Sequence, residues 1–231
     1  MISVSNLVKN YKDACVVDIP SLSIAPRERF GLVGNNGAGK TTLFRMMLDL
    51  VRPSAGEVLI DGKNVLGDDG WKRYVGSYLD ENFLIDYLTP DEFFEFVGRL
   101  HGYSKEDLRL FLERFQEFFN GEITGKTKYI RDLSKGNLKK VGIAAAFIGN
   151  PRVVILDEPF ESLDPTSQIR LKNILLREAE AHQITYLLSS HDLNHVTDVC
   201  NRIVLLEKGK VLKDMKDDAN MLQQLEAYFT A

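Results

Sequence analysis

The stretch "GLVGNNGAGKTTLFRMML" (residues 31–48) is the strongest indication of the fold in this sequence. It begins in the apolar run "RFGLV" at 29–33, which predicts a short buried strand. The glycine-rich segment "GNNGAGKT" follows at once, and behind it Leu43, Met46 and Met47 recur at helical spacing. A glycine-rich loop that leaves a strand and opens a helix is typical of a phosphate-binding loop in an α/β protein.

This loop has the pattern G-x-x-x-x-G-K-S/T, with Gly34, Gly39, Lys40 and Thr41 at the fixed positions. Its glycines let main-chain N–H groups wrap around a polyphosphate. Lys40 would place a positive charge at the β- and γ-phosphates, and the Thr41 hydroxyl is a hard oxygen ligand suited to Mg²⁺. We therefore expect the whole loop to bind a nucleotide: Gly34, Asn35, Asn36, Gly37, Ala38, Gly39, Lys40 and Thr41.

A second element supplies two adjacent carboxylates. The segment "VVILDE" at 153–158 predicts a buried strand that ends at Asp157 and Glu158. Ligands gather at the carboxyl ends of strands in open α/β sheets, so Asp157 can face a metal ion while Glu158 acts as the base for an attacking water. These two elements indicate a P-loop nucleoside triphosphatase, and kinases, GTPases and motor ATPases remain open at this point.

The rest of the chain alternates strands with helices. Strands are expected in "ISVSNLV" (2–8), "SLSI" (21–24), "GEVLI" (56–60) and "ITYLLSS" (184–190), and helices after 133, over 166–181 and over 192–200. A hairpin is expected to turn at Lys208-Gly209. This alternation predicts a parallel sheet with helices on its faces.

The segment from 83 to 120 has a different character. It predicts two helices and no strand, with Thr89 and Ser104 as N-caps and Gly121 at the end of the second helix. Eight of the chain's 13 phenylalanines lie here, so we expect this segment to have a small core of its own.

Composition excludes several classes of protein. The 231 residues fit one domain, and a net charge of −4 without a basic block gives no support to nucleic-acid binding. No stretch approaches 18 apolar residues and no apolar signal core stands at the start, so any membrane role would come through a partner. Cys15 and Cys200 are isolated, which fits a reducing compartment and offers no metal or cluster ligands.

Three further motifs follow in a fixed order: "LSKGN" (133–137), "SLDP" (162–165) and "SSHD" (189–192). Together with the two phosphate-site elements, they resemble the ATP-binding subunit of ABC transporters over nearly the whole chain. The "GNNGAGKTTL" and "LTPDEF" segments are most similar to those of small, ABC-2-like exporter systems. The resemblance implies one domain over 1–231: a RecA-like P-loop core with a parallel sheet, a small antiparallel β subdomain, and an α-helical subdomain inserted at about 82–133.

In that family two copies face each other head to tail, and each ATP lies between the P-loop of one copy and the signature loop of the other. The signature loop of this chain is "LSKGN", where Ser134 and the N–H groups near Gly136 would complete the cage around the partner's γ-phosphate. Two positions depart from the usual L-S-G-G-Q, namely Lys135 and Asn137. Lys135 adds positive charge near those phosphates.

The same resemblance assigns further residues. Tyr11 is similar to the aromatic residue that stacks on adenine, with a structural tyrosine at a strand end as the alternative. Thr42 would contact the α-phosphate, Asp164 resembles the interface aspartate of the D-loop, and His191 resembles the switch histidine that contacts the γ-phosphate. Phe160 and Glu161 replace small residues of the family pattern, and the sequence gives no account of them.

A larger departure lies in "YVGSYLDEN" (74–82), where the family has a glutamine. The alignment of the motif places Asp80 at that position, with Glu81 as the alternative. A carboxylate could also ligate Mg²⁺, so we count Asp80 with Thr41 and Asp157 as expected metal ligands. It would add repulsion near the γ-phosphate, and hydrolysis would be slower or differently coupled.

The sequence therefore predicts an ATP-binding and ATP-hydrolysing subunit that powers an ABC transporter through ATP-driven dimerisation. ATP and Mg²⁺ are the expected cofactors, and Glu158 and His191 the expected catalytic residues. The expected partners are a second copy or a paired ATPase subunit and integral membrane permease subunits, at the cytoplasmic face of the membrane. Two alternatives remain: a soluble ABC-type ATPase, for example in iron–sulfur cluster assembly, and a P-loop phosphotransferase such as a nucleotide kinase, which the signature loop and His191 oppose.

Overall fold

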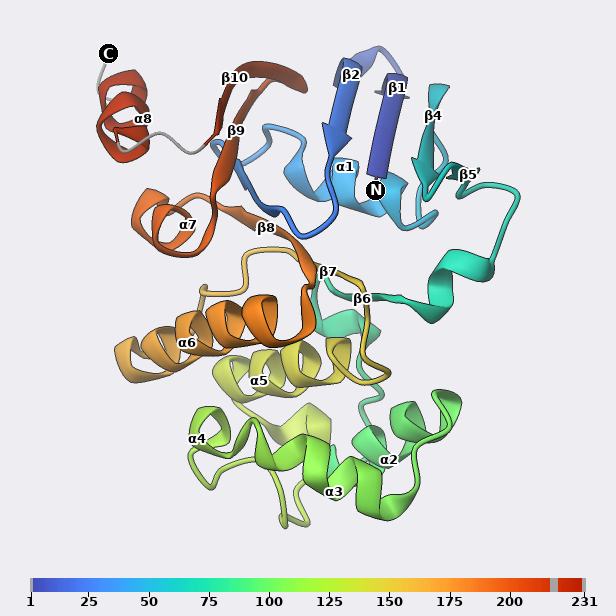
Figure 1. Cartoon of the computed structure of the whole chain (residues 1–231), viewed down its shortest axis with the longest axis vertical. Coiled ribbons are helices and arrows are strands. Elements are labelled where there is room, and N and C mark those ends of the chain that lie inside the picture. Colours follow the sequence, from blue (N-terminus) through green and yellow to red (C-terminus); the bar gives the residue numbers. More distant parts are fainter. Residues whose placement is uncertain (1, 217–219, 230–231) are drawn as a thin grey trace.

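The computed structural model describes residues 2–216 and 220–229 and contains two β-sheets and several helices (Figure 1). The central sheet has the strand order β10-β9-β3-β8-β7-β6. Its strands are β3 (Arg29–Val33), β6 (Val75–Tyr78), β7 (Val153–Leu156), β8 (Thr185–Ser190), β9 (Arg202–Glu207) and β10 (Lys210–Lys216). All neighbours from β9 to β6 are parallel, and only β10 pairs in the antiparallel sense. The predicted parallel core is confirmed.

A second, antiparallel sheet has the order β2-β1-β4-β5. Its strands are β1 (Ile2–Tyr11), β2 (Ala14–Ile24), β4 (Ala55–Ile60) and β5 (Lys63–Asn64). One continuous buried core joins this sheet to helix α1 (Lys40–Met47) and to one face of the central sheet. The packing of α1 in this core places its first residues near the end of β3.

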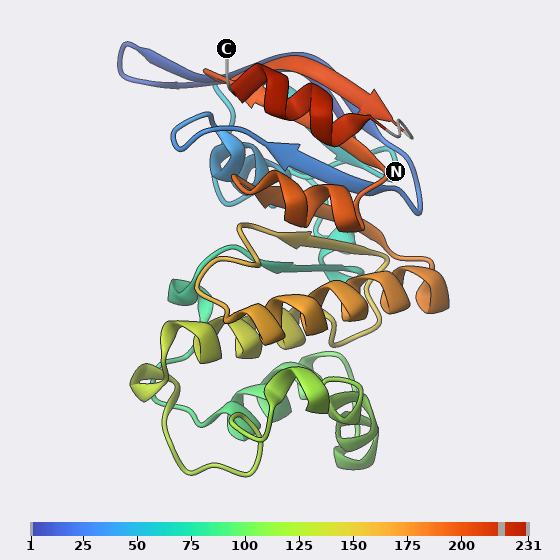
Figure 2. The same ribbon diagram turned by 90° about the vertical axis from the view of Figure 1, so that its left-hand side faces the viewer.

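Helices cover the other face of the central sheet (Figure 2). Besides α1, the described residues form α2 (Pro90–Leu100), α3 (Lys105–Glu113), α4 (Gln116–Phe119), α5 (Lys135–Ala146), α6 (Pro165–His182), α7 (Leu193–Val199) and α8 (Met221–Phe229). Residues 2–216 and 220–229 also contain three short 3₁₀ turns: η1 (Gly70–Arg73), η2 (Glu81–Phe83) and η3 (Ile130–Asp132). Helices α5 and α6 lie next to the sheet, and α2 to α4 form the end of the molecule opposite the antiparallel sheet (Figure 1).

The insert begins as its sequence predicts. Thr89 and Ser104 are the N-caps of α2 and α3, and both form capping boxes with the acidic residue three positions on. The prediction of only two helices is wrong, however. Helix α3 ends at Glu113 and a separate turn of helix, α4, precedes Gly121, because the backbone at Phe115 leaves the helical region.

The expected separate core of the insert is also wrong. Its buried phenylalanines belong to the same cluster as the residues under the central sheet. Phe115 lies 5.6 Å from Phe147 at the end of α5, and Phe147 lies 6.0 Å from Tyr186 in β8, measured between ring centroids. Aromatic rings are large enough to reach across the layer of helices, so the insert is anchored to the sheet rather than packed on itself.

Candidate functional site

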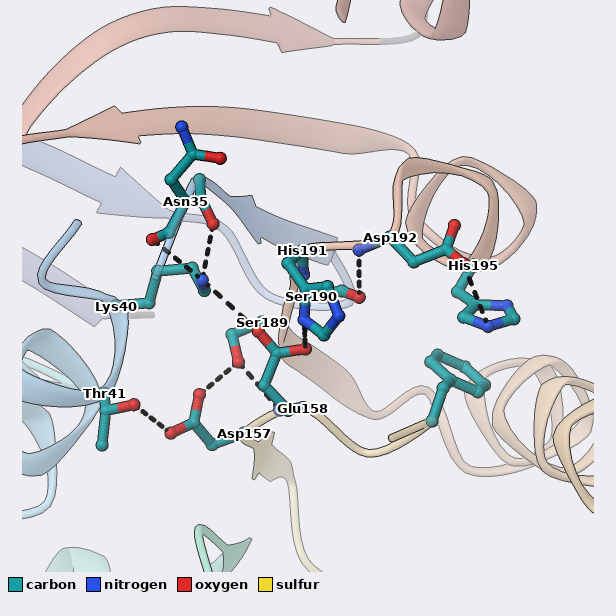
Figure 3. A network of polar contacts seen from close by, with 12 residues as sticks. Asn35, Lys40, Thr41, Asp157, Glu158, Ser189, Ser190, His191, Asp192 and His195 are labelled. Atoms are coloured by element: carbon teal, nitrogen blue, oxygen red, sulfur yellow. Dashed lines mark hydrogen bonds and ion pairs between the residues drawn. The ribbon is translucent and has the colours of Figure 1, made fainter. Parts of the chain in front are cut away.

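Three neighbouring strands of the central sheet end at the same edge. The glycine-rich loop follows β3, Asp157 follows β7 and His191 follows β8. The parallel register pairs Val33 with Ser190 and Leu156 with Leu188, so these strand ends lie side by side. The fold therefore brings together the expected phosphate loop, the two carboxylates and the histidine (Figure 3).

The glycine-rich loop forms a pocket of about 240 Å³, lined by Val16, residues 35–42 and Glu158. Gly39 has a φ of +104°, and a Cβ atom there would lie 2.6 Å from the Val16 carbonyl oxygen, so only glycine fits. The first turn of α1 begins directly after Gly39 without a side-chain cap. The N–H groups of such a turn have no acceptor within the helix, and residues 40–42 line the pocket, which favours an anion there.

Lys40 lies in this pocket and is only 6% exposed. Its Nζ atom donates to the Gly34 carbonyl oxygen at 2.6 Å and lies 3.3 Å from Oε1 of Glu158. A buried ammonium group needs such partners. The positive charge is thus fixed between the loop and the carboxylate of the neighbouring strand end.

Asp157 receives two hydroxyl groups. Thr41 donates to one oxygen of its carboxylate and Ser189 to the other (Figure 3). Burial raises the pKa of Asp157, while these hydrogen bonds and the charge of Lys40 act in the opposite direction. A carboxylate and a hydroxyl group that already meet are hard oxygen ligands of the kind Mg²⁺ prefers.

Glu158 lies between Lys40 and His191. One carboxylate oxygen faces the ammonium group of Lys40, and the other lies 3.0 Å from Nδ1 of His191 and accepts from the His191 main-chain N–H at 3.3 Å. The main chain of Glu158 is left-handed, with a φ of +45°. Its N–H donates to the Ser189 hydroxyl at 2.9 Å.

The signature loop lies elsewhere on the surface. Ser134 and Lys135 are exposed, and Ser134 caps α5 by accepting from the Asn137 N–H at 3.3 Å. Gly136 is packed against the D-loop, since a Cβ atom there would lie 3.0 Å from the Ser162 carbonyl oxygen. Neither Ser134 nor Gly136 is among the described residues that line the pocket at Lys40.

Two other expected site residues also lie outside that pocket lining. Tyr11 is 47% exposed, and the ammonium group of Lys9 lies 4.8 Å from its ring centroid. Asp80 accepts from Arg45 at 3.1 Å through one oxygen and from the Asn82 N–H at 2.9 Å through the other. Any metal contact of Asp80 would compete with these partners, and its metal role stays a prediction.

Sequence reasoning missed the roles of several residues around the site. Ser189 joins Asp157 and Glu158 through its one hydroxyl group, although only His191 was singled out in "SSHD". Phe160, a departure from the family pattern, is buried and packs against the His195 ring at 4.6 Å between centroids. The phenylalanine side chain, which replaces a small residue of the family pattern, is therefore accommodated by packing against His195.

Comparison with known proteins identifies a family. A family profile described as ABC transporter matches residues 17–161. An uncharacterized ABC transporter ATP-binding protein of Methanocaldococcus jannaschii is 36% identical over 91% of this chain and 76% of its own length. A similar protein of Synechocystis is 39% identical over 83% of this chain, but this chain spans 54% of that relative. The methionine import ATP-binding protein of Carboxydothermus hydrogenoformans is 30% identical over 93% of this chain and 66% of its own length.

Solved structures that resemble this chain indicate the same family as these relatives. The ATP-binding subunit of an ABC transporter superposes with a TM-score of 0.86 at 26% identity, with full coverage of both chains. A dimeric ATP-binding cassette bound to ADP and inorganic phosphate, in a post-hydrolysis state, has a TM-score of 0.82 at 25% identity over 95% of this chain and all of its own. Within residues 2–216 and 220–229, no helix is long and apolar enough to cross a membrane.

Proposed function

This chain belongs to the ABC transporter family, and we propose that it hydrolyses ATP to power a transporter through ATP-driven pairing of two cassettes. One observation carries the proposal: Lys40, Asp157 and Glu158 meet at one edge of the sheet, whereas the signature loop lies outside that pocket. The relatives named above are described as transporter ATP-binding proteins, and one of the two structures as the ATP-binding subunit of an ABC transporter, which favours a transporter over the soluble alternative.

The roles of the residues follow from their positions. Lys40 would neutralise the β- and γ-phosphates, and the first-turn N–H groups of α1 would hold their oxygens. Glu158, with its carboxylate 3.0 Å from His191, would accept a proton from the attacking water, and His191 would contact the γ-phosphate.

Thr41 and Asp157 would hold Mg²⁺. The described part of the chain has no group of three or more acidic, histidine or cysteine side chains that could hold a metal alone. A site that offers one hydroxyl and one carboxylate therefore suits an ion that takes its other ligands from phosphates and water. Held by Thr41 and Asp157, Mg²⁺ would supply charge neutralisation for the bound phosphates.

The exposed Ser134 and Gly136 would complete the nucleotide site of a second cassette, either an identical copy or a paired subunit. ADP lacks the γ-phosphate that such a contact needs, so nucleotide state would control pairing. Membrane permease subunits would provide the pathway for cargo and hold this chain at the cytoplasmic face of the membrane.

Phosphate release from Mg-ATP by the purified chain tests the proposal. We expect turnover that stops when a chelator removes the metal and that copurifying membrane subunits stimulate. A chain that transfers the γ-phosphate to another nucleotide instead of water would contradict it in favour of a phosphotransferase. A fully active chain that retains no membrane protein during purification from its native membrane would favour the soluble ATPase.

A further inference from the structure

Helix α5 contacts the segment that follows β7 at two points. Near its start, Gly136 packs against the carbonyl group of Ser162. One turn further on, Nζ of Lys139 donates to the main-chain carbonyl oxygen of Glu158 at 2.6 Å. The helix that begins at the exposed Ser134 therefore reaches the residue that carries the proposed catalytic base.

Lys139 is an unusual residue for this position. It is only 9% exposed, and burial lowers the pKa of its ammonium group. An apolar side chain of similar length would fill the same space without the cost of burying a charge. The direct hydrogen bond of the ammonium goes to a main-chain carbonyl, so it restrains the backbone of Glu158 and leaves the carboxylate to its other partners.

The backbone at Glu158 needs such restraint. Its φ of +45° places a non-glycine residue in the left-handed region, where a Cβ atom makes the backbone conformation unfavourable. Ser189 holds the N–H of Glu158 at 2.9 Å, and Lys139 holds its carbonyl group at 2.6 Å. With both sides of the residue fixed, the carboxylate oxygens reach Lys40 and His191 at the same time.

We propose that Lys139 is a positioning residue that fixes the Glu158 carboxylate and ties it to the helix carrying the signature loop. The inference rests on the proposed ATPase function and adds a physical link between the two halves of the catalytic machinery. If Ser134 contacts the nucleotide of a partner cassette, that contact would act on α5, which is connected to Glu158 through Lys139.

The neighbouring lysine offers a matched control. Lys140 is 3% exposed and lies on the same helix, but its Nζ atom pairs with Glu122 of the insert at 3.2 Å. Lys139→Met and Lys140→Met therefore remove the same charge from adjacent buried positions, and only the first removes a contact to Glu158. Lys139→Arg keeps a donor that can reach the carbonyl group.

Steady-state kinetics on the full chain with Mg-ATP tests the inference. We expect Lys139→Met to lower kcat by about tenfold or more, with KM changed by less than about twofold. Lys139→Arg should recover most of that loss. Lys140→Met should keep kcat within about twofold of the wild type, even if both methionine variants lose thermal stability.

A double-mutant cycle separates positioning from a merely structural role. In a Glu158→Gln background, Lys139→Met should lower the residual rate by less than about twofold, since the base it positions is gone. Equal rate losses for the two methionine variants, or full additivity in the cycle, would overturn the inference while leaving the ATPase function intact. A wild-type chain without any ATPase activity would instead contradict the proposed function and this inference with it.

Discussion

Helices α1 and α5 both begin at short loops that contain glycine, yet the two helix starts differ in every other respect. At α1, the cap residue Gly39 is left-handed with no side-chain cap, and buried Lys40 faces a pocket of about 240 Å³. At α5, Ser134 caps its own helix and is exposed. In the proposed function, the first start is the half of the nucleotide site that one chain supplies by itself. The second start lies at the surface, where a second molecule can reach it.

Removing the charge at the enclosed helix start should have the largest effect. Lys40→Ala deletes a buried ammonium that contacts the loop carbonyl and the Glu158 carboxylate. We expect ATP affinity to fall by about 30-fold or more, because truncating one member of a buried charge pair costs about 2 kcal/mol or more. Titration calorimetry with Mg-ATP measures the affinity. Lys63→Ala, at an exposed lysine, is the control, and equal affinities for both variants would contradict the assignment.

Blocking the exposed helix start should affect turnover and leave nucleotide binding to the monomer intact. Ser134→Arg introduces a long charged side chain where a partner cassette would approach. ATPase activity should fall by about tenfold or more at a protein concentration that supports pairing, while the ATP affinity of the monomer stays within about twofold. Ser21→Arg, at an exposed position of β2 that is distant from Ser134 in the sequence, should change neither the ATPase activity nor the ATP affinity. Normal turnover in Ser134→Arg would show that the signature loop does not meet nucleotide.

The buried carboxylate should produce a smaller effect, on stability. The pKa of Asp157 is raised mainly by burial, so its contribution to stability is present below the unfolded value of 3.8 and is lost as pH rises through the raised native pKa. At pH 7 without nucleotide or metal, Asp157→Asn should therefore raise the melting temperature by about 2 °C or more. The same variant should lose Mg-dependent hydrolysis.

Scanning calorimetry over a pH series that starts near the unfolded value of 3.8 and rises to about 8 measures how the stability difference between wild type and variant changes with pH. The exposed Asp69 serves as the control, because its conversion to Asn removes a charge that is already solvated. A wild-type protein more stable than Asp157→Asn at pH 7 would show that the hydrogen bonds from Thr41 and Ser189 outweigh the cost of burial.

The two helix starts also show what sequence alone can predict. The P-loop pattern, the strand before it and the helix after it all come from one continuous segment, and the structure has each of them. The turn at Lys208-Gly209 was likewise predicted from neighbouring residues alone. Both residues have positive φ values, +46° and +79°, which suit a two-residue hairpin loop. Local patterns with strict backbone demands were predicted well.

Features that depend on tertiary contacts were missed. Strand β6 (Val75–Tyr78) is short and contains Gly76, which has no room for a Cβ atom beside the Ala146 carbonyl group, so its sequence carries little strand signal. Helix α8 was likewise not expected. The contact of Lys139 with Glu158 joins residues 19 positions apart through a side chain and a carbonyl group, and no pattern of residue types encodes it.

In the proposed function, ATP is enclosed only when two of these chains pair, each through its exposed helix start. Glu158→Gln, which keeps the size of the side chain and removes the base, should trap that state. Light scattering of this variant should give the monomer mass without nucleotide and twice that mass with Mg-ATP, and adding Ser134→Arg should restore the monomer. A Glu158→Gln chain that binds Mg-ATP and remains a monomer at every concentration would contradict the claim.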